Sequence, residues 1–360
     1  MQWIRLPSTP TWRLYAGLYA WCVSALVSTA AVAAPAAYTT QLLPTLGGRN
    51  CGAYAINNAG QVAGCSVRAD DGLPRVVRWT SGIAEDLGDA DVGTESRAYA
   101  INALGQLAGY IKNSTLGKRA SIWTGTQLSI LGSSESEAHG INDAGQVSGY
   151  MIIPGVGNHA VIWAGGSVVD LGAFGPYGSS ASGINNSGQV VGLSNVPHRV
   201  QPGRIINHAV WWAGGGATDL TPLQQYTSVA YAISDAGVAV GYVSPRSSAF
   251  PQAAMWKGGR PHTIALAYPT GHYYSQAYAV NAKGQAVGMS YHVDGGGGAA
   301  LWDGRDAIDL NDVLDPALKA AGWVLTDAQG INDNGWIVGN AFNVQTSRGQ
   351  PFILVPRTVP

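Results

Sequence analysis

Tyrosine and histidine side chains gather in one unrepeated stretch of this 360-residue chain, between Lys257 and Gln276. The residues in it that we take as candidate ligand-binding side chains are Tyr268, His272, Tyr273 and Tyr274. Exposed rings of this kind stack on sugar rings or anchor a protein partner. The stretch is therefore the best ligand-binding candidate in the sequence. A loop packed onto its own sheet explains the same residues and is the simpler interpretation.

Motifs of catalysis are scarce in the sequence. It holds no Gly-x-Ser-x-Gly elbow, no phosphate loop, no His-Glu-x-x-His and no paired-cysteine metal site, so we predict neither a metal ion nor a cofactor. A polysaccharide hydrolase or lyase would need two converging carboxyl groups. The unrepeated acids that could supply them are Glu95, Glu135, Glu137 and Asp294. A binding protein is favoured over an enzyme.

The N-terminal region has the pattern of a secretory signal peptide. Arg5 and Arg13 supply positive charge, an apolar run follows, and Ala31-Val-Ala33 is a small-residue cleavage site. We predict removal of residues 1–33, which leaves no stable membrane anchor on a periplasmic or extracellular protein. An uncleaved anchor is the less favoured alternative.

Two cysteines remain in residues 34–360, Cys51 and Cys65. A disulfide between them is the default expectation in an oxidising compartment. Its short loop suggests about 3 kcal/mol of stabilisation through restriction of the unfolded chain. A metal or nucleophilic role has little support, because no third ligand or paired base lies nearby in the sequence.

A twelve-residue phrase occurs seven times, first as Ala53–Gly64 and last as Ala328–Gly339. Copies recur every 46 residues or so, roughly the period of four-stranded propeller blades. Each reads as strand, Asn-x-x-Gly turn and strand, with glycine supplying the positive φ angle. Aspartates that recur in the turns, such as Asp143, are explained by capping of their own backbone. His139 stands where other copies have tyrosine, which suggests a packing variant.

Two further strands follow each hairpin. The third carries an apolar residue before tryptophan, as in Ile122-Trp123, and the fourth contains Asp-Leu or a similar pair, as in Asp86-Leu87. Four strands in seven repeats predict an all-β, seven-bladed propeller, one domain spanning residues 34–360. Small residues of the first strand would face the axis, with tryptophan farther out. The last repeat lacks a fourth strand, so we expect the N-terminal segment ending at Leu42–Gly47 to pair with Phe352–Val355 and close the ring.

The repeats also resemble the HAF family of extracellular repeat proteins, named for a His-Ala-Phe-like triplet. The motif Gly-Ile-Asn-Asp-x-Gly-Gln-x-x-Gly carries the resemblance, with His159-Ala-Val161, His208-Ala-Val210 and Pro351-Phe352 in place of the triplet. The stretch Asp309–Trp323 is similar to the family's approach to its final repeat. The resemblance implies export and a repeat fold, and it brings no catalytic residues.

Composition limits the partners. The net charge is −1 and only 11% of residues are charged, so the chain lacks the basic stripe that nucleic-acid binding needs. We therefore expect an exported, non-catalytic propeller that binds a glycan or protein at the cell envelope or outside the cell. A polysaccharide hydrolase or lyase with carboxylates at the channel mouth is the alternative, and a structural surface protein is a third possibility.

Overall fold

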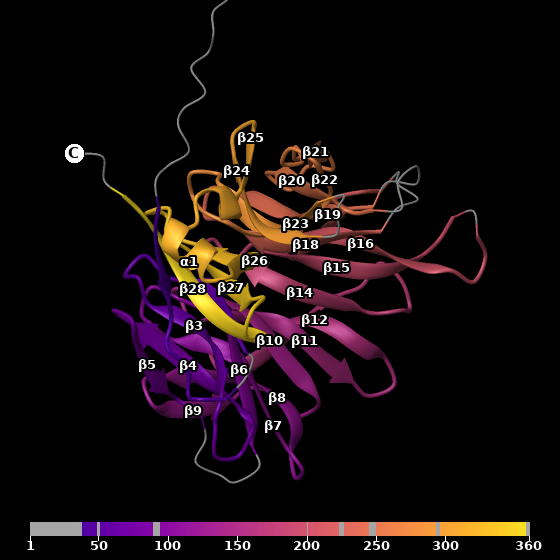
Figure 1. Ribbon diagram of the computed structural model, residues 1–360. Helices are drawn as coiled ribbons and strands as arrows, with labels where there is room; N and C mark the ends of the chain where they lie inside the picture. Colours follow the sequence, from indigo (N-terminus) through magenta and orange to yellow (C-terminus); the bar gives the residue numbers. More distant parts are fainter. Residues whose placement is uncertain are drawn as a thin grey trace, which may run out of the picture. The chain divides into compact units, whose positions relative to one another are not determined.

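The computed structural model describes residues 38–48, 51–88, 94–199, 201–222, 227–244, 250–292 and 296–357. They belong to one compact unit, Pro35–Pro360. In the described residues the strands form seven four-stranded antiparallel sheets arranged as the blades of a propeller (Figure 1). The predicted seven-bladed all-β fold is confirmed. The predicted signal peptide, residues 1–33, lies outside the described residues.

Each blade is numbered here from the strand nearest the axis outward. Blade 1 contains β2 (Ala53–Ile56), β3 (Val62–Val67), β4 (Pro74–Thr80) and β5 (Ile83–Asp86). Blade 2 contains β6 (Glu95–Ile101), β7 (Leu107–Asn113), β8 (Gly117–Thr124) and β9 (Gln127–Ile130). Blade 3 contains β10 (Ser136–Ile141), β11 (Val147–Ile153), β12 (Gly157–Ala164) and β13 (Ser167–Gly172). Blade 4 contains β14 (Ser179–Ile184), β15 (Val190–Pro197), β16 (Ile205–Ala213) and β17 (Gly216–Asp219).

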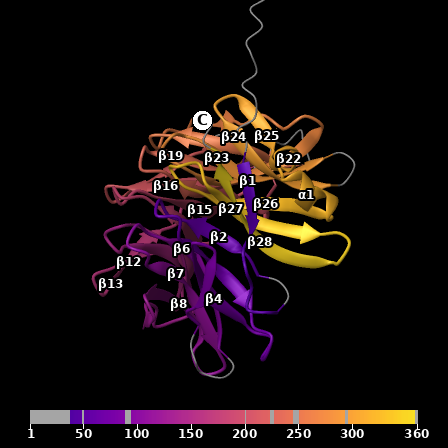
Figure 2. The ribbon, with the colours of Figure 1, turned by 60° about the vertical axis from the view of Figure 1, so that its left-hand side comes forward.

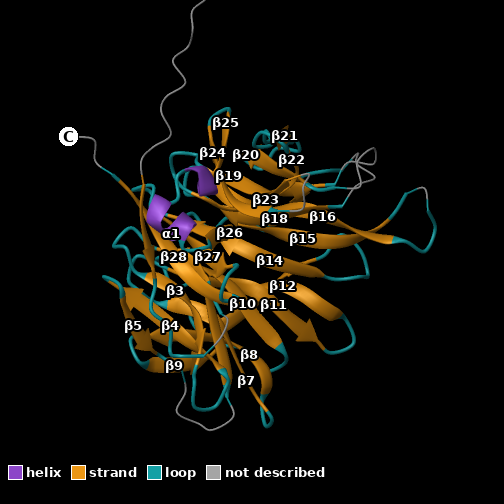
Figure 3. Ribbon diagram, viewed as in Figure 1, coloured by secondary structure: helices purple, strands orange, loops and turns teal. Residues whose placement is uncertain are grey.

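Blade 5 contains β18 (Ser228–Ile233), β19 (Val238–Val243), β20 (Gln252–Lys257) and β21 (Ile264–Ala265). Blade 6 contains β22 (His272–Val280), β23 (Ala286–His292), β24 (Gly297–Asp303) and β25 (Asp306–Asp309). Blade 7 contains β26 (Trp323–Ile331), β27 (Ile337–Asn343), β28 (Arg348–Pro356) and β1 (Tyr38–Leu42). The two short helices, η1 (Leu310–Asp312) and α1 (Pro316–Ala320), lie in the connection between blades 6 and 7 and are purple in Figure 3.

Small residues let the innermost strands converge. The first strand of each blade contacts the first strand of the next blade around the whole ring. A Cβ atom added at Gly140 would lie 3.2 Å from the Gly183 Cα atom of the neighbouring blade. This close approach explains the alternation of alanine and glycine in these strands.

Tryptophan fills the wider space farther from the axis, as predicted. Third-strand tryptophans are 0 to 4% exposed in six blades. They are Trp79, Trp123, Trp163, Trp212, Trp256 and Trp302. Each hydrophobic cluster draws residues from two neighbouring blades, so Val76 of blade 1 lies in one cluster with Ala98 and Trp123 of blade 2. The core is therefore a series of layers between blades.

Serine hydroxyls fasten one blade to the next. In five places a backbone N–H of a third strand donates to a serine Oγ on the innermost strand of the following blade, at 2.9 to 3.1 Å. The five serines are Ser96, Ser136, Ser179, Ser228 and Ser275. All are buried, so each bond satisfies polar groups that water cannot reach.

The asparagine of each turn has two roles. Asn57 Oδ1 accepts from the backbone N–H groups of Ala59 and Gln61, the local cap expected of a turn asparagine. Its Nδ2 donates to the Asn102 carbonyl of the next blade at 3.0 Å. The same bond between blades recurs from Asn102, Asn142, Asn185, Asn281 and Asn332. We call this set the asparagine ring, and Ser234 interrupts it.

The turn aspartates do not cap their own backbone, as we expected from the sequence. Asp143 Oδ1 accepts from the backbone N–H of Ala103 in the preceding blade at 2.8 Å. Asp235 accepts in the same way from Asn186, and Asp333 from Ala282. The local cap is already supplied by the asparagine one residue earlier, so the aspartate carboxylate reaches across to the next turn.

The N-terminal strand closes the ring. β1 pairs antiparallel with β28, from Tyr38 opposite Pro356 to Leu42 opposite Phe352 (Figure 2). The predicted pairing is confirmed, but the strand ends at Leu42 and does not continue to Gly47. Pro44 has no N–H to give to a ladder, and its carbonyl accepts the Trp79 indole N–H of blade 1 at 2.8 Å.

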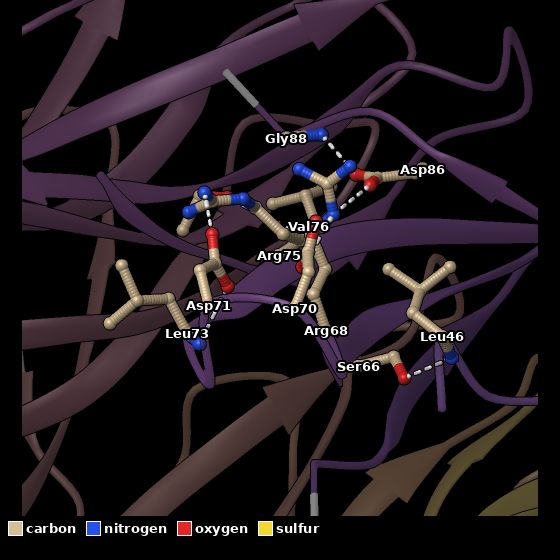
Figure 4. A network of polar contacts seen from close by, with 11 residues as sticks. Leu46, Ser66, Arg68, Asp70, Asp71, Leu73, Arg75, Val76, Asp86 and Gly88 are labelled. Atoms are coloured by element: carbon tan, nitrogen blue, oxygen red, sulfur yellow. Dashed lines mark hydrogen bonds and ion pairs between the residues drawn. The ribbon is translucent and has the colours of Figure 1, made fainter. Parts of the chain in front are cut away.

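The disulfide and a charged cluster hold blade 1. Cys51 and Cys65 are bonded, as predicted, which ties the approach to β2 to β3. In Figure 4 the Arg75 side chain lies beside Asp71, with Nη2 2.6 Å from Oδ2. Arg68 Nε is 3.4 Å from an Asp86 oxygen. Arg75 is 2% exposed, so the Asp71 carboxylate offsets part of the cost of burying a guanidinium group.

Among the described residues, no helix has the length and apolar character needed to cross a bilayer.

Candidate binding site at the channel mouth

The axis of the ring holds two cavities, one above the other. One cavity, of about 250 Å³, is lined by the turn residues of all seven blades at the level of the asparagine ring. The other, of about 200 Å³, is lined by the earlier residues of the innermost strands. Isoleucines line both, namely Ile56, Ile141, Ile184, Ile233 and Ile331. An apolar collar therefore separates two polar ends.

The second cavity receives one polar side chain from each blade, two residues before the isoleucine or its equivalent. They are Tyr54, Tyr99, His139, Ser182, Tyr231, Tyr278 and Gln329. This position alternates with buried alanine along each strand, so it faces the axis. We call the end of the channel where these side chains lie the mouth. The sequence position that we interpreted as packing is thus a channel lining, and His139 is part of it.

One side of the mouth carries charge. Tyr110 Oη donates to Glu95 Oε1 at 2.6 Å, and Arg97 Nε lies 3.4 Å from the same oxygen. On the next blade Lys118 Nζ donates to Glu137 Oε2 at 2.9 Å, and Tyr150 Oη donates to that oxygen at 3.1 Å.

Aromatic rings join the two carboxylates of this side. The Tyr99 ring lies 6.1 Å from the Tyr110 ring and 6.0 Å from the His139 ring, centroid to centroid. Lys118 Nζ lies 4.8 Å from the centroid of the Tyr110 ring. We call Glu95, Arg97, Tyr99, Tyr110, Lys118, Glu137, His139 and Tyr150 the charged arc. Two of the four unrepeated acids of the sequence, Glu95 and Glu137, come together here.

Glu137 is held in its ionised form. Burial raises the pKa of this carboxyl, but the charge of His139, the hydrogen bond and charge of Lys118, and the hydrogen bond from Tyr99 outweigh burial. The pKa of Glu137 therefore lies below its ordinary value of 4.5. The carboxylate is a hydrogen-bond acceptor at neutral pH.

The tyrosines of the mouth are neutral. Burial raises the pKa of Tyr99 and of Tyr150 well above the ordinary value of 10.0, and the Glu137 carboxylate adds to both shifts. Burial likewise raises the pKa of Tyr231 and of Tyr278. Their hydroxyl groups therefore donate and accept hydrogen bonds and do not act as bases at neutral pH.

The opposite side of the mouth lacks charged groups. The Tyr231 ring lies 5.5 Å from the Tyr278 ring and 5.9 Å from the Tyr242 ring. Gln276 connects them, since Tyr278 Oη donates to Gln276 Oε1 at 3.3 Å and Gln276 Nε2 donates to Tyr274 Oη at 2.6 Å. The Tyr274 ring in turn packs edge-on against Tyr291 at 5.0 Å. We call Tyr231, Tyr242, Tyr274, Gln276, Tyr278 and Tyr291 the tyrosine arc.

The four predicted ligand-binding residues do not form one group. Tyr274 belongs to the tyrosine arc, whereas the Tyr273 ring packs edge-on against Phe250 at 4.5 Å. The His272 side chain is only 4% exposed and lies in another cavity, between blades 6 and 7. Tyr268 is half-buried in the connection before β22, and burial raises its pKa.

The stretch that we predicted as one loop, Lys257–Gln276, contains β21 and the first part of β22. His272, Tyr273 and Tyr274 are strand residues, because the alternating pattern of β22 continues backward from its repeat. Of the other unrepeated acids, Glu135 is exposed and Asp294 lies outside the described residues.

Within the described residues, no three His, Cys, Asp or Glu side chains are grouped so as to hold a metal ion.

No family model and no curated protein sequence matches the chain. Solved structures do. The chain is similar to the β-propeller domain of the Trilobed protease from Pyrococcus furiosus, with a TM-score of 0.58 and 13% identity over 84% of this chain and 95% of that one. It is also similar to oligogalacturonate lyase from Vibrio parahaemolyticus, with a TM-score of 0.54 and 9% identity over 89% and 97%.

A third similar structure is a puromycin-hydrolyzing peptidase from Mycobacterium tuberculosis, with a TM-score of 0.53 and 12% identity over 88% of this chain and 56% of that one. At these identities the likeness shows the propeller fold and no more.

Proposed function

We propose that this chain is an exported, non-catalytic propeller that binds a glycan at the channel mouth, at the cell envelope or outside the cell. The observation that carries the proposal is the two-sided mouth, with neutral tyrosines on one side and fixed hydrogen-bonding charges on the other. A sugar ring has an apolar C–H face and an edge of hydroxyl groups. Aromatic faces suit the first, and carboxylate, amide and guanidinium groups suit the second.

The state of Glu137 favours binding over catalysis. A glycosidase needs a carboxyl group that is protonated near neutral pH, which requires a raised pKa. Glu137 has a lowered pKa and is engaged by Lys118 and Tyr150. Such a carboxylate accepts hydrogen bonds from ligand hydroxyls but has no proton to donate.

A polysaccharide hydrolase or lyase is the second candidate. It is favoured by one observation, that Glu95 and Glu137 both belong to the charged arc. We also propose that the chain belongs to the HAF family, on the motif Gly-Ile-Asn-Asp-x-Gly-Gln-x-x-Gly and the two His-Ala-Val triplets.

The test uses residues 34–360 on an array of plant, bacterial and fungal oligosaccharides, followed by calorimetry with the best ligand. Replacing Tyr274 with alanine is expected to weaken binding at least tenfold, about 1.4 kcal/mol. Tyr273→Ala is the matched control, because Tyr273 is next in the strand but packs on Phe250. It should bind like the wild type.

Absence of glycan binding, or equal losses in the two variants, would contradict a glycan site at the mouth. Release of new sugar ends or unsaturated products from the bound oligosaccharide, abolished by Glu137→Gln, would identify the enzyme instead.

A further inference from the structure

Blade 6 departs from the repeat at one position. Four residues before the third-strand tryptophan, the earlier blades carry large polar side chains, namely Arg75, Arg119, His159, His208 and Gln252. Blade 6 has Gly298 there, preceded by Gly296 and Gly297. The space that a long side chain occupies in its neighbours is therefore left open in blade 6.

The carboxylate that this side chain would meet is still present. In blade 3, His159 Nδ1 lies 2.9 Å from Asp170, and in blade 4, His208 Nδ1 lies 2.8 Å from Asp219. The fourth strand of blade 6 carries Asp309 at the corresponding place. A Cβ atom at Gly298 would lie 3.0 Å from Asp309 Oδ1, so the missing side chain would cover the carboxylate.

A cavity of about 330 Å³ occupies this region, between blades 6 and 7. Its lining includes His272, His292, Asp309, Lys319, Trp323 and Val344. Lys319 and Trp323 come from the connection that holds η1 and α1, which other blades lack in the described residues. The cavity is thus built from two features that occur once in the ring, the glycine run and the helical connection.

His272 is fixed in place within this cavity. Its Nδ1 lies 2.7 Å from Ser290 Oγ, and its Nε2 lies 3.5 Å from Asp309 Oδ2. Ser290 is fully buried, so this serine, histidine and aspartate do not present a nucleophile to a ligand. Their arrangement instead orients the imidazole and the carboxylate as hydrogen-bonding groups.

The junction itself is held together independently of the cavity. Blade 7 has Thr326 where the serine of the other junctions stands, and its hydroxyl donates within its own blade to Asn340 O. Asn311 replaces the missing bond, with its Oδ1 accepting from the Leu325 N–H at 2.8 Å and its Nδ2 donating to the Leu325 carbonyl at 3.0 Å. The polar groups of the cavity are therefore not needed to join the blades.

We propose that this cavity is a second binding site, which takes a single pyranose ring. Trp323, Val324 and Val344 line its apolar part, while Asp309, His292 and Lys319 bring hydrogen-bonding groups to the same space. An aromatic residue with a carboxylate beside it matches the C–H face and the adjacent hydroxyls of a sugar. The choice of ligand class rests on the proposed function; the site itself rests on the cavity.

The cavity and the mouth open next to each other. Tyr291 of the tyrosine arc precedes His292 of the cavity, and a Cβ atom at Gly297 would collide with the Tyr291 ring, 2.6 Å from Cε1. An oligosaccharide lying on the tyrosine arc therefore has a terminal-unit pocket beside it.

The test measures binding of free monosaccharides, a panel of hexoses, N-acetylhexosamines and hexuronates, by saturation-transfer NMR and calorimetry. Val344 is 61% exposed at the rim, so Val344→Trp should fold normally and block the cavity. We expect it to weaken monosaccharide binding at least tenfold. Phe342→Trp, at a 39% exposed position two residues earlier that does not line the cavity, is the matched control.

Asp309→Asn keeps a side-chain acceptor for the Asn311 N–H but removes the charge, and it should also lose binding. Tyr274→Ala should leave monosaccharide binding unchanged, which separates this site from the mouth. The proposal is overturned if no monosaccharide binds, if Val344→Trp binds like Phe342→Trp with both variants folded, or if free amino acids bind in place of sugars.

Discussion

Glu137 is the residue at which binding chemistry and folding stability meet. Its carboxylate is 8% exposed and receives hydrogen bonds from Lys118 and Tyr150. Burying a charge is unfavourable unless it is paired and hydrogen-bonded, and here both conditions hold. The mouth therefore carries a fixed negative group whose ionisation is linked to folding.

The sign of this linkage follows from the lowered pKa. The unfolded chain has the ordinary value of 4.5 and the folded chain a lower one, so Glu137 stabilises the fold fully above pH 4.5. That contribution is lost as the pH falls through the folded value. We expect Glu137→Gln to lower the free energy of unfolding by about 1–3 kcal/mol at pH 7 and by much less at pH 3.

Urea titrations between pH 3 and 7 measure this difference. Glu135→Gln is the control, because Glu135 is exposed and only two residues away. A loss for Glu137→Gln that stays the same at every pH would show that the carboxylate is not linked to folding.

Ser234 is the one break in the asparagine ring. Asn332 makes its bond to the Asn57 carbonyl although Trp336 stands where most copies have glutamine, so the asparagine alone suffices. Ser234→Asn should therefore add a seventh bond, to the Asn281 carbonyl. We expect about 0.5–1.5 kcal/mol of added stability, the net worth of one such hydrogen bond.

Thermal and chemical unfolding measure the gain. Asn142→Ser creates a second break and should destabilise by a similar amount or more, since it also removes the local cap. Ala236→Asn adds the same amide at an exposed position of the same turn and should have little effect. No gain from Ser234→Asn would mean that blade 5 cannot bring the two groups together.

At the scale of elements, β1 protects the edge of β28. Five residue pairs join the two strands, and Leu43 N–H donates to the Pro351 carbonyl beyond them. A chain that begins at Leu43 leaves the N–H and C=O groups of β28 unpaired. We expect it to aggregate or to exchange strands between copies, because an open edge is a template for pairing.

Light scattering after size-exclusion chromatography, with melting curves, checks this prediction. A chain that begins at Pro35 keeps β1 and should remain monomeric. An unchanged melting temperature and a monomeric state after loss of β1 would show that ring closure does not depend on this strand.

The elements were largely predictable because the sequence repeats them. Alanine and glycine, tryptophan, and Asp-Leu recur at fixed places, and each has a simple steric or turn-forming reason. The error over Lys257–Gln276 arose where the repeat is weakest, since β21 is only two residues long and β22 extends beyond its repeated part. A single sequence gives no sign of where such a strand begins.

The site was harder to predict than the fold. Tyr54, Tyr99 and Tyr231 recur at one position, and repetition suggested packing, whereas the position faces the axis. Alternation with buried alanine was the available signal. The pairing of Glu95 with Arg97 and of Glu137 with Lys118 depends on how far neighbouring blades lie apart, which no local pattern encodes.

At the scale of the whole molecule, seven similar blades give one ring with an asymmetric face. The backbone repeats, but the mouth has a charged arc over blades 2 and 3 and a tyrosine arc over blades 5 and 6. The helical connection and the glycine run occur once, between blades 6 and 7. Differences between repeats, more than the repeats themselves, therefore carry the proposed binding chemistry.

Ring closure by β1 and β28 also determines how the molecule responds to mechanical force. Tyr38 lies opposite Pro356, so the two chain ends leave the antiparallel pair from the same end. Tension applied between the termini would load the ladder bonds one after another, starting at this pair, and would peel β1 away at low force. Tension applied across the ring through two distant blades would instead load several ladder bonds together. A propeller attached to a surface through both termini would be opened easily, whereas one attached through a single terminus would keep its closure unloaded.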